Sequence, residues 1–161
     1  KIWLIALRLK LSLISYRGLL ADMRTKKVKA PPKKFEYILN ISREHDDIKN
    51  KDYISFRFQT TKEFLTFQYI LKMKNTVEDK NLYFNILGFS APISDLSSSG
   101  TAGYEYRLYD FKYSEYCVVV DKKDSDKSKF KMLIQRSKTH PVKITNITKK
   151  SFIEISSEDD S

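Results

Sequence analysis

The chain has 161 residues, of which 41% are hydrophobic and 13% aromatic, with 30 Lys and Arg, 20 Asp and Glu and a single cysteine. This composition supplies enough apolar side chains for a folded core and excludes a wholly disordered chain. One cysteine excludes an intramolecular disulfide framework and a zinc site built from cysteines. Cys117 precedes three valines and is expected to be a small buried hydrophobic residue.

The positive charge is concentrated at the amino terminus. Residues 1–34 hold ten basic side chains and one acidic one, a net charge of +9, whereas residues 35–161 hold 20 basic and 19 acidic ones, a net charge of +1. A net charge of +10 favours an anionic partner. Because almost all of the net charge lies in residues 1–34, we assign binding of an anionic partner to that segment. No phosphate-binding surface is predicted on residues 35–161.

Residues 2–23 fit two periodicities. Leucines that alternate with Arg8, Lys10 and Ser12 favour a half-buried strand, whereas richness in Leu and Ala over about twenty residues favours a helix. We predict the helix, which has apolar stripes on two opposite sides and therefore needs cover on both. One stripe and the polar flank are predicted to contact a partner through Leu4, Leu7, Leu11, Ile14, Lys10, Arg17 and Arg24.

The same segment bears on localisation. Arg8 and Lys10 interrupt the only apolar stretch long enough to be considered as a membrane span, so no transmembrane segment is predicted. Because these charges lie inside the stretch and no small-residue cleavage site follows, no clear secretory signal is predicted either. An Arg- and Ser-containing, acid-poor start leaves organellar import open.

Residues 25–34 are predicted to be a linker, because two prolines exclude a helix and five lysines keep the segment solvated. Lysines on an extended linker can neutralise phosphates of a nucleic acid, contact an anionic membrane surface or enter an acidic groove of a protein. Simple solvation is the alternative. The lysines concerned are Lys26, Lys27, Lys29, Lys33 and Lys34.

From residue 35 the apolar residues alternate with polar ones as they do in half-buried strands. Turn-like breaks separate eight or nine such runs. We predict an all-β domain over residues 35–155, an antiparallel β-sandwich of immunoglobulin-like or similar type, followed by a disordered acidic tail over residues 156–161. The runs begin with Phe35, Ile54, Leu65, Leu82, Tyr104, Tyr116, Phe130, Val142 and Phe152.

Residues 104–120 resemble the late strands of immunoglobulin-like sandwiches in pattern only, since the inter-sheet cysteine pair is absent and Trp3 lies outside the sandwich. The stretch before them, residues 90–103, is expected to be a long loop. Long loops are disproportionately functional, so this one is the candidate contact loop of the domain. The candidate contact residues are Ser98, Ser99, Gly100, Thr101 and Gly103.

No constellation of catalytic residues is found in the sequence. His45 lies among aspartates in a charged stretch over residues 42–52 and is expected to be a solvated turn histidine rather than a metal ligand. Asp121, Asp124 and Asp126 do not fit the EF-hand spacing and are expected to lie in a solvated hairpin turn. The prediction is therefore no enzyme, no metal and no cofactor.

The expected function is that of a non-enzymatic β-sandwich interaction module or accessory subunit. It would dock into a larger assembly through its basic apolar N-terminal segment, because one small sandwich cannot cover both apolar stripes. The alternative is a nucleic-acid-binding accessory protein that uses the lysine-rich arm on phosphates. The expected partner is a protein, with an anionic membrane surface or a nucleic acid as alternatives through residues 1–34, and no small-molecule substrate is inferred.

Overall fold

The chain divides into two units, residues 1–32 and residues 33–161. The structure is a computed structural model that describes residues 35–65, 68–91, 99–123, 126–137 and 139–157, all of which belong to the second unit. The helix predicted over residues 2–23 and the lysine-rich linker lie outside the described residues.

The predicted all-β fold is confirmed. Within the described ranges the regular structure consists of strands, and there is no helix among them. The nine strands are β1 (Tyr37–Asp46), β2 (Lys51–Phe64), β3 (Ile70–Glu78), β4 (Asn81–Ser90), β5 (Gly100–Leu108), β6 (Glu115–Lys122), β7 (Lys127–Ile134), β8 (Val142–Asn146) and β9 (Ile153–Ser157).

The strands form one mixed sheet instead of the two antiparallel sheets of the predicted sandwich. Its order is β8-β7-β6-β4-β3-β5-β2-β1-β9. The hairpin neighbours are antiparallel, but β1 pairs with β9, β3 with β5 and β4 with β6 in parallel. The sandwich prediction was wrong in this respect, because alternation along a strand reports which side chains are buried and not which strand lies beside it.

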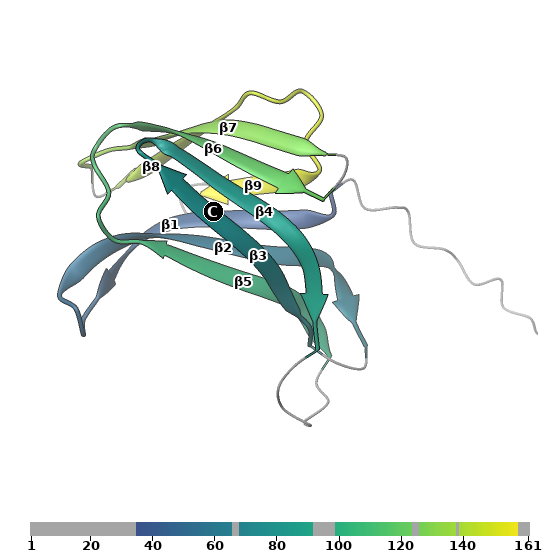
Figure 1. Cartoon of the computed structure of the whole chain (residues 1–161). Coiled ribbons are helices and arrows are strands. Elements are labelled where there is room, and N and C mark those ends of the chain that lie inside the picture. Colours follow the sequence, from purple (N-terminus) through teal and green to yellow (C-terminus); the bar gives the residue numbers. More distant parts are fainter. Residues whose placement is uncertain (1–34, 66–67, 92–98, 124–125, 138, 158–161) are drawn as a thin grey trace, which may run out of the picture. The chain divides into compact units, whose positions relative to one another are not determined.

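The sheet curls around its own apolar face and becomes nearly barrel-shaped (Figure 1). Side chains from strands far apart in the sheet meet inside, as the rings of Phe58 on β2 and Phe84 on β4 do at 5.0 Å between centroids. The edge strands β8 and β9 approach each other, since Ile144 and Ile155 line one hollow. A sheet with one apolar face buries that face either against a second layer or by curling. In the described part of this chain the sheet buries its apolar face by curling.

The hairpin between β1 and β2 is longer than the sequence suggested. Instead of a charged turn over residues 42–52, β1 continues to Asp46 and β2 begins at Lys51. Opposite charges face one another across these strands, as in the contact between Arg43 and Asp52 at 2.5 Å. Cross-strand pairs of this kind stabilise a sheet, so charged residues that resemble a turn extend the strands.

Candidate functional site

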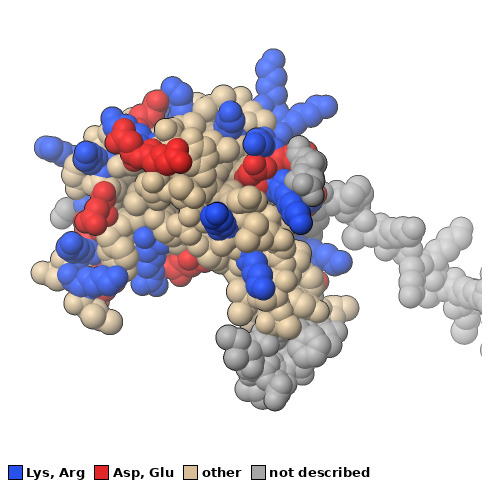
Figure 2. All heavy atoms as spheres, in the orientation of Figure 1, with Lys and Arg blue, Asp and Glu red and all other residues tan. Residues whose placement is uncertain are grey.

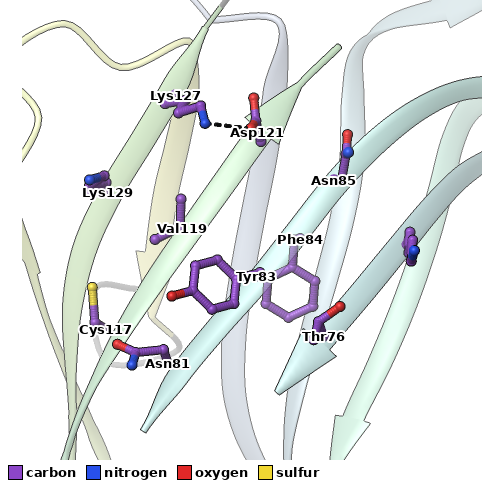
Figure 3. Close-up of a pocket in the computed structure, with 11 residues that line it drawn as sticks. Thr76, Asn81, Tyr83, Phe84, Asn85, Cys117, Val119, Asp121, Lys127 and Lys129 are labelled. Carbon is purple, nitrogen blue, oxygen red and sulfur yellow. Dashed lines mark ion pairs between the residues drawn. The ribbon is translucent and has the colours of Figure 1, made fainter. Parts of the chain in front are cut away.

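A shallow hollow of about 450 Å³ lies on the outer face of the sheet, over β3, β4, β6 and β7 (Figure 3). Its lining includes one hydroxyl, one phenol, two amides, one carboxylate and three ammonium groups. We call it the lysine groove. The polar residues that give it this chemistry are Thr76, Tyr83, Asn81, Asn85, Asp121, Lys74, Lys127 and Lys129.

The register of the sheet brings these side chains together. In one row across the strands, Lys74 pairs with Asn85, Asn85 with Asp121, and Asp121 with Lys127. Residues that face each other across neighbouring strands point to the same side of a sheet. The lysines of β3 and β7 therefore stand on opposite sides of the groove, although more than fifty residues of chain separate them.

A second row, two residues further along each strand, makes the floor. Thr76 pairs with Tyr83, Tyr83 with Val119, and Val119 with Lys129. Tyr83 leans from β4 toward β6 (Figure 3). Because Cys117 and Val119 on β6 have short side chains, the surface is hollow between the tyrosine ring and the lysines of β7.

Cys117 is not the buried residue that was expected. It is partly exposed and lines the groove, whereas its neighbour Val118 is fully buried. The strand alternates in and out with a period of two, so the three valines that follow the cysteine do not all point inward. Val118 and Val120 face the core, and Val119 faces the groove.

The groove has a positive charge excess. Asp121 forms an ion pair with Lys127, with 3.0 Å between the carboxylate oxygen and the ammonium nitrogen. Within the described ranges, Lys74 and Lys129 have no carboxylate within 4.0 Å. The ammonium groups of Lys74 and Lys129 therefore remain available to a ligand, whereas that of Lys127 is paired with the carboxylate of Asp121.

The charge is divided unevenly among the strands. Strands β3, β4, β6, β7 and β8 contain seven basic and three acidic residues, a net charge of +4. Strands β1, β2, β5 and β9 contain five basic and six acidic ones, a net charge of −1. On the face in Figure 2, basic side chains together with some acidic ones surround a largely uncharged centre. The near-neutral total expected for the domain therefore conceals one side of the sheet with an excess of basic residues.

A second polar cluster lies at the end of the β1–β2 hairpin. His45 Nδ1 lies 2.7 Å from Asp52 Oδ1, and the other carboxylate oxygen of Asp52 contacts Arg43 at 2.5 Å. The hydrogen bond to Asp52 raises the pKa of His45, and the hydrogen bonds from His45 and Arg43 lower the pKa of Asp52. Asp46 accepts hydrogen bonds from the turn backbone and from Tyr109. The charges and hydrogen-bonding groups of this cluster are therefore paired within the protein.

The described aspartates of the two stretches around His45 and Asp121 form no cluster of metal-ligating side chains. No group of three or more metal-ligating side chains occurs in the part of the chain that the structure describes. Asp121 lies in β6 and pairs with Lys127, and Asp124 lies outside the described residues.

The sequence-predicted contact loop is shorter than expected. Gly100, Thr101 and Gly103 belong to β5 and pair with β2, so only Ser99 of the five candidates lies in a described loop segment. Ser98 is outside the described residues. Glycine and threonine suggested a flexible surface, but backbone pairing with β2 places them in the sheet.

The predicted N-terminal contacts have no described position. They are the partner-binding residues Leu4, Leu7, Leu11, Ile14, Lys10, Arg17 and Arg24 and the phosphate-binding residues Lys26, Lys27, Lys29, Lys33 and Lys34. The lysine groove, in contrast, was missed by sequence reasoning. A signal was present, because Lys127, Lys129 and Lys131 alternate with the apolar Phe130 and Met132 and must share one outer face.

No helix in the described ranges has the length and apolar character needed to cross a membrane. Comparison of the chain with models of protein families, with curated proteins and with solved structures found no match.

Proposed function

We propose that the protein is a non-enzymatic interaction module that binds an anionic partner in the lysine groove. The observation that supports this most is the register that places Lys74 on β3 and Lys127 and Lys129 on β7 around one hollow. Ammonium groups on opposite sides can contact successive negative groups of one ligand, while the amides between them supply hydrogen bonds.

The shape of the groove supports binding of an extended partner. It is open to solvent along its length, and its floor follows the sheet instead of enclosing a small molecule (Figure 3). Small-molecule sites usually bury most of their ligand in a concave, mainly apolar pocket. A shallow polar surface with charge on both sides suits a polymer that remains half exposed.

The proposal includes anchoring in a larger assembly through residues 2–23. This part is supported by the sequence, in which two apolar stripes need cover on both sides. Deleting residues 1–27 should remove co-purifying proteins and leave the lysine groove able to bind its anionic partner. If the truncated protein keeps every partner and the full chain is a soluble monomer, the anchoring role is wrong.

Binding in the groove can be tested with heparin oligosaccharide as a generic polyanion. In the full chain, Lys74, Lys127 and Lys129 are replaced together by Gln, and the matched control replaces the exposed Lys62, Lys149 and Lys150 by Gln. Calorimetric titration at low salt should show much weaker binding for the groove variant than for the control. Equal binding by the two variants would show that the groove is not the site.

A further inference from the structure

We infer that the anionic partner is a single-stranded nucleic acid whose bases lie along β4 and whose phosphates contact the lysines on either side. This inference rests on the proposed function and specifies its ligand. It is carried by aromatic and apolar side chains that a merely basic surface does not need.

The outer face of β4 presents a strip of exposed apolar side chains. Tyr83 is 39% exposed and Leu87 51%, whereas the alternate residues Leu82, Phe84 and Ile86 are buried in the core. The strip ends at Leu87, because Phe89 pairs with the buried Leu71 and contacts the ring of Phe64, which packs against the core. Exposed aromatic rings on a sheet are platforms on which unstacked bases can lie.

Lysines stand on both sides of this strip. Lys72 and Lys74 belong to β3, the antiparallel neighbour of β4, and Lys127, Lys129 and Lys131 belong to β7, beyond the short side chains of β6. Successive lysines on one strand are two residues apart, about 6.6 Å along its axis. They can therefore follow the backbone of an extended strand and contact several phosphates in turn.

Asn81 and Asn85 lie beside Tyr83 on the same face of β4 and line the groove. Each amide offers both donors and an acceptor, which match the edges of bases that are not paired. A duplex keeps its bases stacked and paired, so it cannot use the tyrosine ring as a platform. A peptide built of acidic residues alone, such as polyglutamate, would use the lysines but has no rings to place on Tyr83. The combination of groups favours an unpaired strand.

The first measurement is the salt dependence of binding to fluorescent oligo(dT) and oligo(U). The full chain, the groove variant and the control variant are those used with heparin, so the lysine-rich arm is present in all three. Each phosphate contact on a single strand contributes about 0.7 to the slope of log affinity against log salt. Losing three lysines should lower the slope by about 2, and the control should keep the slope of the unmodified chain.

The second measurement separates stacking from charge. Tyr83→Ala should weaken binding by about fivefold to a hundredfold at an unchanged salt slope, because a lost stacking platform releases no counterions. Tyr113→Ala removes a ring of similar exposure, 46%, that does not line the groove. It should leave the dissociation constant unchanged. Equal effects of the two substitutions would overturn the assignment of Tyr83.

Polyglutamate and a duplex of the same charge complete the test. The inference predicts tighter binding of the single strands than of either competitor, and a difference between oligo(dT) and oligo(U) identifies DNA or RNA as the natural form. If heparin or polyglutamate binds in the groove and the oligonucleotides do not, the nucleic-acid inference fails and the proposed function stands. If no polyanion distinguishes the groove variant from its control, both fail.

Discussion

His45 shows how a single contact changes the behaviour of a residue that the sequence places in a solvated turn. Its side chain is nearly half exposed, yet its Nδ1 atom lies 2.7 Å from the carboxylate of Asp52. This hydrogen bond favours the protonated imidazole and raises the pKa of His45 above its usual value of 6.5. The same contact and that of Arg43 lower the pKa of Asp52 below 3.8.

These two shifts predict opposite pH dependences of stability. The contribution of His45 is fully present below about pH 6.5 and is lost as the pH rises through its raised pKa in the folded state. The contribution of Asp52 is present above about pH 3.8 and is lost as the pH falls through its lowered pKa. The pair is therefore most favourable between these limits.

We predict that Asp52→Asn lowers the pKa of His45 toward its usual value. The amide cannot accept a charge-assisted hydrogen bond from the imidazolium with the strength of a carboxylate. NMR titration of the His45 ring protons from about pH 5 to about pH 8 measures the change. His45→Gln should correspondingly flatten the loss of thermal stability on the alkaline side. An unchanged His45 titration in the Asp52→Asn variant would contradict the role of this contact.

At the scale of the element, the β3–β4 hairpin is irregular where it supplies the apolar strip. The register shifts between Lys72 and Met73, and opposite this shift Gly88 has a φ of 134°. Residues other than glycine rarely adopt such a backbone angle. The irregularity makes Leu87 an extra residue of β4, so the outer strip ends at Leu87 and Phe89 pairs with the buried Leu71.

We predict that Gly88→Ala destabilises the protein by about 1–3 kcal/mol, from backbone strain alone. A Cβ at this position would meet nothing within 4 Å, so a clash cannot be the cause. The matched control is Gly103→Ala, whose Cβ would lie at an ordinary contact distance of 3.6 Å from the carbonyl oxygen of Phe58. It should change the free energy of unfolding by less than about 0.5 kcal/mol. Urea unfolding compares the two, and equal effects would rule out the strain argument.

At the scale of the whole domain, the last strand returns to the first. β9 pairs in parallel with β1, and Tyr37 lies opposite Ile153. Ile153 is 2% exposed and belongs to the same core as the strands of the opposite half of the sheet. The short edge strand β9 therefore pairs with β1 and also contributes Ile153 to the core.

We predict that Ile153→Ala lowers the free energy of unfolding by about 2–5 kcal/mol, the usual range for a buried isoleucine. Ile147→Ala is the control, because its side chain is 49% exposed and follows the other edge strand. The control should cost less than about 1 kcal/mol. Both are measured by denaturant unfolding of the full chain. A similar small loss for both variants would show that β9 is not needed to complete the core.

The differences between prediction and structure have a common origin in pairing. The charged stretch over residues 42–52 resembles a turn until β1 and β2 are placed side by side, where Arg43 meets Asp52. Gly100 resembles a loop residue until it pairs with Phe64 of β2. In each case the missing information was the neighbour across the sheet. Residue propensity alone cannot supply that neighbour, because strand propensity depends on what lies beside the residue.

The strands and their buried faces could be located from the order of residues, because alternation with a period of two is a local property of an extended chain. The concentration of charge in residues 1–34 was equally evident from a count. The three-dimensional arrangement was needed to show that the strands share one curled sheet and that β4 lies beside β6. That parallel pairing places Lys74 and Lys127 around one groove. A near-neutral domain thereby acquires a basic face, since a sum of charges contains no information about which side of a sheet they occupy.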